Sequence, residues 1–283
     1  MLVAKTSLAL SVLTLFLASQ TVKVDVNLIN VFVTVHDEAG KPVAGLTRDD
    51  FVVYDDDQPQ AISVFEKDEA VHSSIAVLMD TSGSMVDILP FMNRGVRDFA
   101  QTILHPDEYY VMTFGTSVRM IHRSPQTVVH LDQVLKELKP YGTSVLFDAM
   151  QYGMDRVQTS ENQRKALVVF TDGYDNGSKL NYGRVARDAQ ASGALLYFVA
   201  IGSKILVDTQ TLESLASVSG GRTFYVPKSD SVSPYLARIR DELSRQYYLG
   251  YYTGRRSGLH HIRVETPNQK GLTLHARTAY WGG

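Results

Sequence analysis

Apolar residues alternate with polar ones near the start of the chain, and the alternation then changes phase. From Val22 to Leu28 every second residue is apolar, and Val31, Val33 and Val35 resume the pattern one step out of phase. A period of two is typical of a strand with one buried face. The change of phase predicts either a pair of strands or one bulged strand.

Turn-forming residues interrupt the sequence that follows. The segment "DEAGKP" predicts a turn, Thr47 a helix cap, and "FVVYDDDQPQAISVF" a strand, an acidic turn and a second strand. The acidic run Asp55-Asp56-Asp57 lacks the spaced ligands of a calcium loop, so a hairpin turn is favoured over a Ca²⁺ site. Residues 21–71 are therefore predicted to form a small all-β unit.

From Ser73 onward, strand-like runs alternate with helix-like stretches. The runs "SIAVLMD", "EYYVMTFG", "KALVVFTDG" and "ALLYFVAIG" are separated by segments whose apolar residues recur with helical spacing. This order predicts an α/β domain over residues 72–246, with a doubly wound, mainly parallel sheet that is covered on both faces. Pro90 predicts a kink or a delayed start in the first helix.

The end of the chain, residues 247–283, returns to strand-like sequence with "YYLGYY", "HHIRVET" and "LTLHARTAYW". Fewer than about 40 residues of strand rarely fold alone. We therefore predict that these strands pair with the N-terminal β unit, so that the α/β domain is inserted between two halves of one sandwich. Two separate β appendages are the alternative.

The N-terminus has the pattern of an export signal. Lys5 precedes "SLALSVLTLFLA", an apolar run that is long enough for a signal peptide and short for a bilayer span. We interpret residues 1–20 as a signal peptide of a periplasmic, secreted or envelope-associated bacterial protein. An uncleaved membrane anchor and a cytosolic chain are the alternatives. The sequence contains no cysteine, which excludes disulfides.

Charge and motifs exclude several classes of function. The chain of 283 residues carries 28 Lys and Arg against 30 Asp and Glu, without a long basic tract, so no nucleic-acid partner is expected. A membrane partner is expected only if the signal segment is uncleaved. The sequence also lacks a phosphate-binding loop, a Gly-x-Ser-x-Gly elbow and a His-Glu-x-x-His zinc motif.

Carboxylates and hydroxyls gather where predicted strands end. Asp80 ends the first α/β strand and is followed by Ser82 and Ser84, Asp172 ends a later strand, and Thr143 precedes a predicted helix. In open parallel sheets the functional crevice lies beyond the carboxyl ends of the strands. We therefore expect these side chains to form an oxygen-only pocket.

An oxygen-only pocket suits a hard divalent cation, because Mg²⁺ prefers octahedral oxygen ligands. If Ser82, Ser84 and Thr143 bind directly while Asp80 and Asp172 act through water, the neutral hydroxyls leave the ion electron-poor. One position then stays open for a carboxylate from another molecule. For each segment alone, an ordinary helix cap or turn is the alternative.

Together the three segments resemble the von Willebrand factor A domain and its metal-ion-dependent adhesion site. The motif "DTSGS" supplies Asp80, Ser82 and Ser84, "GTS" supplies Thr143, and "FTDG" supplies Asp172. The resemblance implies a six-stranded sheet and Mg²⁺- or Mn²⁺-dependent binding of a protein that presents Asp or Glu, without catalysis. The flanking segments resemble a family of exported bacterial proteins, abundant in Acidobacteria, that carry such a domain.

Three other functions stay open. The chain could be a metal-dependent hydrolase directed at phosphate, a structural envelope component with a non-functional motif, or a cytosolic helper of an AAA+ ATPase. A hydrolase needs a base, a nucleophile or a second metal beside the first. The motif segments contain no His, Lys or Arg, which disfavours hydrolysis.

Residues near the motif have an ordinary structural interpretation and a functional one. Asp175 and Asn176 are interpreted as a solvated loop rather than as groups near the metal, and Asp148 as an ordinary helix contact rather than a tether of the metal loop. His260 and His261 are adjacent in a predicted strand, so their side chains point to opposite faces and cannot share one metal ion.

Overall fold

The structure is a computed structural model that describes residues 26–67, 72–102, 108–124, 127–202, 208–227, 231–254 and 257–282. The segment interpreted as a signal peptide lies outside the described residues. Within the described ranges, no helix combines the length and the apolar character needed to span a membrane.

The middle of the chain folds around a six-stranded sheet in the order β10-β9-β8-β5-β6-β7. Neighbouring strands run parallel except for the β6–β7 hairpin, so the predicted α/β fold with a mainly parallel sheet is confirmed. The strands are β5 (Ser73–Asp80), β6 (Glu108–Phe114), β7 (Val118–Arg123), β8 (Arg164–Thr171), β9 (Leu195–Ile201) and β10 (Thr223–Val226). The sequence did not predict β7, a half-exposed edge strand with a weak apolar pattern.

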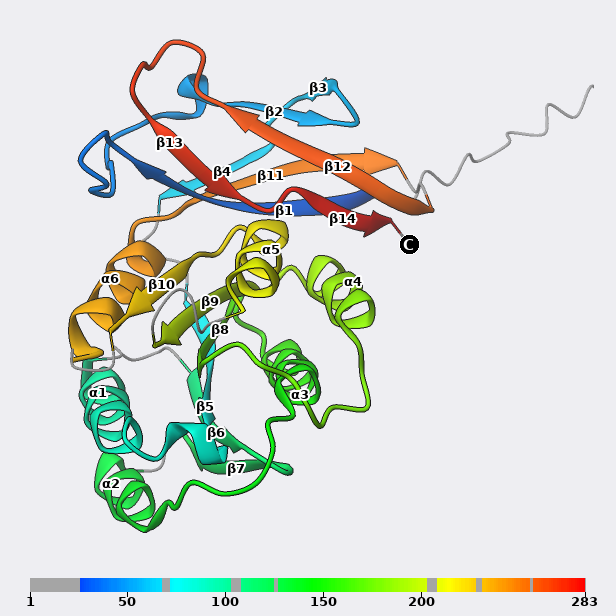
Figure 1. Cartoon of the computed structure of the whole chain (residues 1–283). Helices are drawn as coiled ribbons and strands as arrows, with labels where there is room; N and C mark the ends of the chain where they lie inside the picture. Colours follow the sequence, from blue (N-terminus) through cyan, green and yellow to red (C-terminus); the bar gives the residue numbers. More distant parts are fainter. Residues whose placement is uncertain are drawn as a thin grey trace, which may run out of the picture.

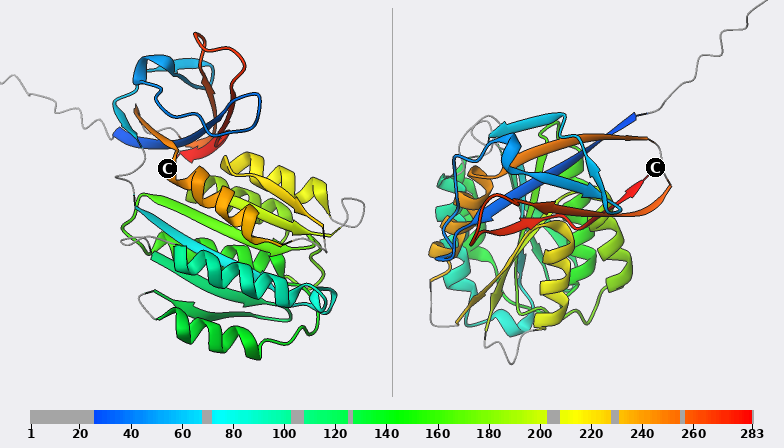
Figure 2. Two further views of the ribbon diagram at one scale, coloured as in Figure 1. Left: turned by 90° about the vertical axis from the view of Figure 1, so that its left-hand side faces the viewer. Right: turned by 90° about the horizontal axis from the view of Figure 1, so that it is seen from above.

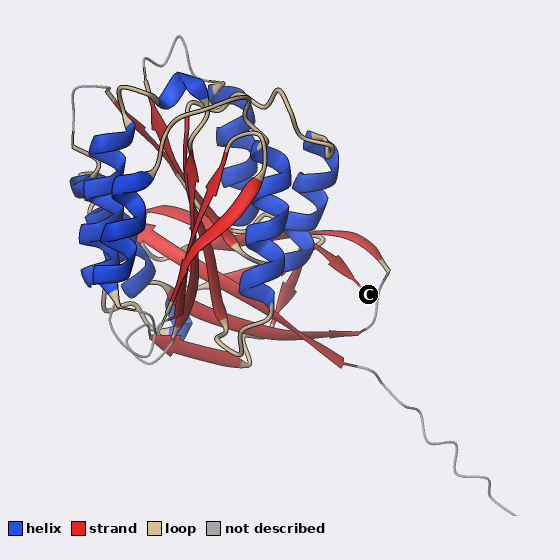
Figure 3. Cartoon of the chain, turned by 90° about the horizontal axis from the view of Figure 1, so that it is seen from below, coloured by secondary structure: helices blue, strands red, loops and turns tan. Residues whose placement is uncertain are grey.

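Helices cover both faces of this sheet (Figure 3). On β5, Ile75 and Val77 pack toward α1, α2 and α6, while Ala76 and Leu78 pack toward α3, α4 and α5. α1 begins after a short 3-10 turn, so the delayed start predicted from Pro90 is confirmed. The helices are α1 (Leu89–Thr102), α2 (Val128–Glu137), α3 (Leu146–Gln158), α4 (Tyr182–Ser192), α5 (Thr209–Ser219) and α6 (Ser233–Ser244).

Both ends of the chain build one sandwich of two four-stranded sheets, β13-β1-β11-β4 and β14-β12-β2-β3 (Figure 1). β1 pairs antiparallel with β11, and β2 pairs antiparallel with β12, so segments on either side of the α/β part share both sheets. The strands are β1 (Val26–His36), β2 (Val52–Asp55), β3 (Gln58–Gln60), β4 (Val64–Lys67), β11 (Tyr247–Gly254), β12 (Gly258–Glu265), β13 (Thr273–Ala276) and β14 (Ala279–Gly282).

β1 is one continuous strand in regular register with β11, so the prediction of a strand pair or a bulged strand is wrong. Its apolar pattern changes phase because both of its faces become buried. Val31 and Val33 face the sandwich core, whereas Phe32 belongs to the α/β core and stacks on Tyr248 at a ring distance of 5.1 Å. The alternation of apolar and polar residues therefore ends where β1 meets the α/β part.

The sandwich packs over one end of the α/β part, as two views at right angles to Figure 1 show (Figure 2). Contacts fix this placement at the amino ends of the parallel strands. The buried Gln246 side chain donates hydrogen bonds to Thr34 Oγ1 of β1 at 3.1 Å and to the hydroxyl of Tyr197, near the start of β9, at 3.4 Å. The carboxyl ends of the strands consequently face away from the sandwich.

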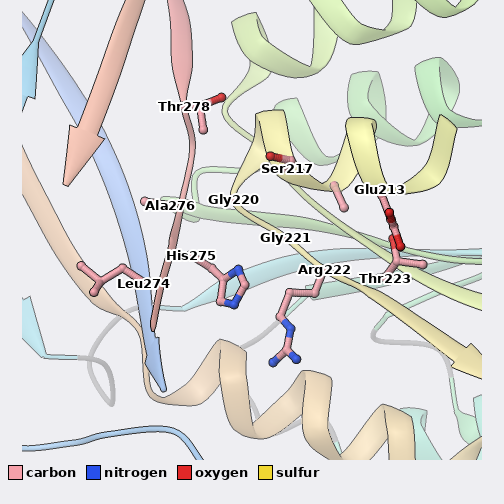
Figure 4. Close-up of a pocket in the computed structure, with 11 residues that line it drawn as sticks. Glu213, Ser217, Gly220, Gly221, Arg222, Thr223, Leu274, His275, Ala276 and Thr278 are labelled. Atoms are coloured by element: carbon pink, nitrogen blue, oxygen red, sulfur yellow. The ribbon is translucent and has the colours of Figure 1, made fainter. Parts of the chain in front are cut away.

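A charged network also spans this junction. The buried Glu242 carboxylate of α6 accepts a hydrogen bond from Arg222 at 2.5 Å and lies 3.3 Å from His36 Nε2 of β1. Beside it, Figure 4 shows Arg222, Thr223 and His275 around a pocket between α5, β10 and β13. The network joins the Arg222–Glu242 ion pair of the α/β part to the buried His36 of the sandwich.

This junction predicts a dependence of stability on pH. Burial and, after it, the positive charge of Arg222 lower the pKa of His275 to about 4. Since an unfolded histidine has a pKa near 6.5, the unfolded chain binds this proton first, and the contribution of His275 to the free energy of unfolding falls as the pH drops from about 6.5 to about 4. The pKa of Asp80, raised to about 6, acts in the opposite direction, so the comparison is made between variants. In urea unfolding, the stability of His275→Gln relative to the wild type should rise as the pH drops through this range. The exposed control His261→Gln should keep the wild-type slope, and equal slopes in all three proteins would contradict this assignment.

Candidate metal-binding site

Asp80 is the last residue of β5, and its side chain is 0% exposed. Its Oδ1 accepts a hydrogen bond from the Ser82 backbone N–H at 2.8 Å. Its Oδ2 accepts from the hydroxyls of Thr171 at 2.9 Å and Ser144 at 3.3 Å. One carboxylate therefore joins the ends of β5 and β8 to the loop before α3.

The environment of Asp80 disfavours its negative charge. Burial raises the pKa of Asp80 to about 6, the hydrogen bonds from Ser82 and Thr171 oppose the rise, and the nearby charge of Asp172 adds to it. The donors that contact the carboxylate are neutral hydroxyl and amide groups. A cation beside Asp80 would favour its charged form.

The hydroxyls beyond Asp80 have a spacing that fits a small cation. Ser82 Oγ and Ser84 Oγ lie 3.1 Å apart. Octahedral coordination at 2.0–2.1 Å places neighbouring ligand atoms about 2.9 Å apart. Two hydroxyls at this separation, next to a buried carboxylate, match the donor set of a hard divalent cation.

Thr143 lies on the exposed loop between Gly142 and α3. A Cβ atom at Gly177 would lie 2.9 Å from Thr143 Oγ1, so a glycine at that position leaves space for the hydroxyl. Gly142 has a φ of +79°, in the left-handed region that glycine adopts most readily. Both glycines thus help to set the position of the Thr143 hydroxyl.

The loop after β8 is largely exposed to solvent, as the sequence suggested, but hydrogen bonds of Asp175 and Asn176 also fasten it to the start of α3. Asn176 Oδ1 accepts a hydrogen bond from the Ser144 backbone N–H at 2.8 Å. Asp175 Oδ1 accepts from the Phe147 backbone N–H at 3.3 Å. The Thr143 loop therefore has a fixed position against the Asp172 loop.

Asp148 extends this attachment from inside α3. Its carboxylate accepts hydrogen bonds from the backbone N–H groups of Lys179 at 3.1 Å and Leu180 at 3.0 Å. The favoured interpretation of Asp148 as an ordinary helix contact is wrong, because its partners lie in the loop after β8. Asp148 tethers the segment that follows Asp172.

The structure relates the five predicted residues in different ways. Asp80, Ser82 and Ser84 are joined by hydrogen bonds, and Asp172 is close enough to Asp80 to affect its pKa. Thr143 is placed through its neighbour Ser144. The sequence analysis gave no role to Ser144 and Thr171, although both belong to the quoted motifs "GTS" and "FTDG".

Comparison with known proteins assigns the α/β part. The family model of the von Willebrand factor type A (VWA) domain matches residues 74–238. The chain belongs to the VWA family. Membership makes this VWA protein a protein-interaction or adhesion module in general terms. No curated protein matches the chain in sequence.

Solved structures share the VWA fold at low identity. A von Willebrand factor type A protein from Catenulispora acidiphila is 12% identical with a TM-score of 0.55, and the match covers 89% of this chain and 74% of that one. BatB from Bacteroides thetaiotaomicron is 15% identical (TM-score 0.50; 60% and 98% covered). Proximal thread matrix protein 1 from the mussel byssus is 17% identical (TM-score 0.53; 68% and 50% covered). Such identities support the fold alone.

The tether at Asp148 predicts a local effect on the site. In Asp148→Asn, two backbone N–H groups lose a charged acceptor, and hydrogen bonds to charged groups contribute about 1.5–3 kcal/mol. The amides of Lys179 and Leu180 should exchange with deuterium at least about tenfold faster, since 1.4 kcal/mol is a factor of ten. Asp155→Asn, on the same helix and bonded to Gln151, is the matched control. Unchanged exchange in Asp148→Asn would refute the tether.

Proposed function

We propose that this VWA protein binds protein partners through a divalent metal ion, Mg²⁺ or Mn²⁺, at the carboxyl ends of β5 and β8. The observation that carries the proposal is the pair of hydroxyls, Ser82 and Ser84, 3.1 Å apart beside the buried carboxylate of Asp80. Ser82, Ser84 and Thr143 would hold the ion directly. Asp80 and Asp172 would act on it through hydrogen bonds and water.

Each residue has a distinct part in this arrangement. Asp80 positions the Ser82 backbone, and its contacts with Ser144 and Thr171 keep three segments together. The three hydroxyls bring no negative charge, so they leave the charge of the ion uncompensated. When bound, the ion supplies the positive charge that attracts a carboxylate of the partner. An Asp or Glu of the partner would complete the site.

Exposed apolar side chains in the same three loops define the surface around the ion. Val86 is 58% exposed, Tyr141 78% and Tyr174 50%. The Tyr141 backbone donates a hydrogen bond to Thr81 O at 2.8 Å, so this loop is attached to the strand end that carries the site. Tyrosine is enriched among the residues that dominate binding energy in interfaces. We infer that the partner presents a carboxylate flanked by apolar side chains.

We also infer that the protein acts by binding, without catalysis, and that it is exported. The motif segments provide no His, Lys or Arg to serve as a base or to stabilise a leaving group. The proposal of export rests on Lys5 and the apolar run that follows it. In an exported protein, the open carboxyl ends of the sheet would be available to partners outside the cell or in its envelope.

Removal of the metal should lower stability through the site. A ligand that binds only the folded state adds about 2.7 kcal/mol at 100 times its dissociation constant. Excess Mg²⁺ or Mn²⁺ should therefore raise the unfolding temperature of the wild type relative to EDTA. Thr143→Ala, a change at an exposed side chain, should abolish the rise. Ser244→Ala, at an exposed serine of α6, should retain it, and an equal rise in Thr143→Ala would contradict the ligand assignment.

The partner chemistry can be tested without a known partner. Peptides selected from a displayed random library in Mn²⁺ and released by EDTA should contain a shared Asp or Glu next to apolar residues. Tyr141→Ser should weaken these peptides by about tenfold, corresponding to 1.4 kcal/mol, while the metal-dependent rise in unfolding temperature stays unchanged. Selected peptides without a carboxylate, or binding that survives EDTA, would argue against the proposed mode.

A further inference from the structure

A second group of metal-ligating side chains lies in the sandwich, which covers the opposite end of the α/β sheet from Asp80. It consists of Asp55 at the end of β2, Asp56 in the following turn and His260 of β12. Each residue offers one ligand atom, and the three atoms lie within 4.8 Å of one another. This spacing places all three side chains at one candidate site.

Strand pairing brings these residues together from distant parts of the chain. Asp55 pairs with Ile262 of β12, and the Asp56 backbone N–H donates a hydrogen bond to His261 O at 2.9 Å. His260 is buried, whereas its neighbour His261 is exposed, as the alternation along a strand requires. The prediction that the two histidines point to opposite faces is confirmed, but their spacing along the chain does not show that His260 faces Asp55 and Asp56.

Two buried atoms in this group have no hydrogen-bond partner among the described residues. They are Oδ1 of Asp55, a residue that is 1% exposed, and Nε2 of His260, which is 6% exposed. The other Asp55 oxygen accepts a hydrogen bond from the Tyr280 hydroxyl at 2.9 Å. Buried polar atoms are rarely left unpaired because their desolvation is costly. Both atoms are therefore open to a ligand, and the hydroxyl of Tyr251, whose neighbours include Asp55, is likewise unpaired within the described part of the chain.

The contact between His260 Nδ1 and Asp56 Oδ2, at 2.7 Å, fixes the orientation of the imidazole ring. Histidines that bind metals commonly pair their second nitrogen with a carboxylate. Imidazole nitrogen combined with carboxylate oxygen is a donor set of Zn²⁺, whereas Mg²⁺ and Ca²⁺ prefer oxygen alone.

We propose that Asp55 and His260 Nε2 bind a divalent transition-metal ion of the Zn²⁺ class, and that Asp56 orients the His260 ring as a supporting carboxylate. The ion would join the β2–β3 hairpin of the N-terminal segment to β12 of the C-terminal segment. Such a link constrains the unfolded chain and stabilises the fold, since metal binding is coupled to folding. It would serve the purpose of a disulfide in a chain that has no cysteine.

The turn and the strand provide matched variants for a test. Asp56 and Asp57 both have positive φ, 47° and 61°, which asparagine tolerates well. Asp56→Asn therefore removes the charge that orients the His260 ring with little strain, and Asp57→Asn is its control in the same turn. His260→Gln removes the imidazole, and His261→Gln makes the same change on the exposed side of the strand. Thr143→Ala changes the site at Asp80 and leaves this cluster intact, so it distinguishes binding at the two sites.

The experiment is a calorimetric titration of the chelator-stripped full chain with Zn²⁺ in excess Mg²⁺. One Zn²⁺ per wild-type chain is expected, with affinity reduced at least about tenfold in Asp56→Asn and His260→Gln, the lower end of losses seen for residues that support metal ligands. Asp57→Asn, His261→Gln and Thr143→Ala should bind as the wild type does. Because the Thr143→Ala chain is included, failure here is distinguishable from failure of the Mg²⁺ site.

Absence of stoichiometric Zn²⁺ binding by the wild type would overturn the proposal. So would unchanged affinity in Asp56→Asn and His260→Gln, or loss of the Zn²⁺ in Thr143→Ala. Co²⁺ gives an independent readout, because its visible absorption in a site with a histidine nitrogen ligand should disappear in His260→Gln and persist in His261→Gln. If His260→Gln fails to fold, Asp56→Asn decides the question by itself, since its side chain lies at an exposed turn.

Discussion

The buried carboxylate of Asp80 is the interaction on which the candidate site depends. It lies at the end of a strand in which every residue is buried, so the chain places a charge where solvation is poorest. Hydrogen bonds from Ser82, Ser144 and Thr171 compensate part of that cost. The same bonds hold three segments together, so the feature that is costly for folding also builds the site.

The position of the sandwich makes this arrangement useful. Because β1 pairs with β11 and β2 with β12, the two ends of the chain close around the amino ends of the parallel strands. Contacts such as those of Gln246 with Thr34 and Tyr197 hold the sandwich there. The carboxyl ends, where Asp80 and its hydroxyls lie, are left uncovered by the sandwich. Packing against the sandwich at one end and the candidate site at the other are thus separated within one chain.

The fold could be predicted to a large extent from the sequence, because the central strands are buried on both faces and read as continuous apolar runs. Prediction failed where tertiary contacts override local pattern. The phase change in β1 reflects the burial of Phe32 against the α/β core, which no local pattern contains. β7 was missed because an edge strand in which only two of six residues are buried has a weak signal.

The ligand types of the candidate site were predictable from the sequence. The hydrogen bonds that hold its loops in place were predictable only in part. The three motifs placed carboxylates and hydroxyls at strand ends, where parallel sheets bring them together. Asp148 and Asn176 accept hydrogen bonds from backbone N–H groups about thirty residues away, and these bonds depend on the loop path, which spacing along the chain does not show. The cluster around His260 was missed for the same reason, because its partners come from the other end of the chain.

Anomalous diffraction from crystals of the full chain grown with Mn²⁺ tests the central claim most directly. The account predicts one Mn²⁺ peak at the carboxyl end of β5, bonded directly to the hydroxyls of Ser82, Ser84 and Thr143. Asp80 would act on the ion through hydrogen bonds and water, and one coordination position would be open to water or to a carboxylate of another molecule. A peak bonded directly to Asp80 with no hydroxyl ligand, or no peak at this end of the sheet, would contradict it.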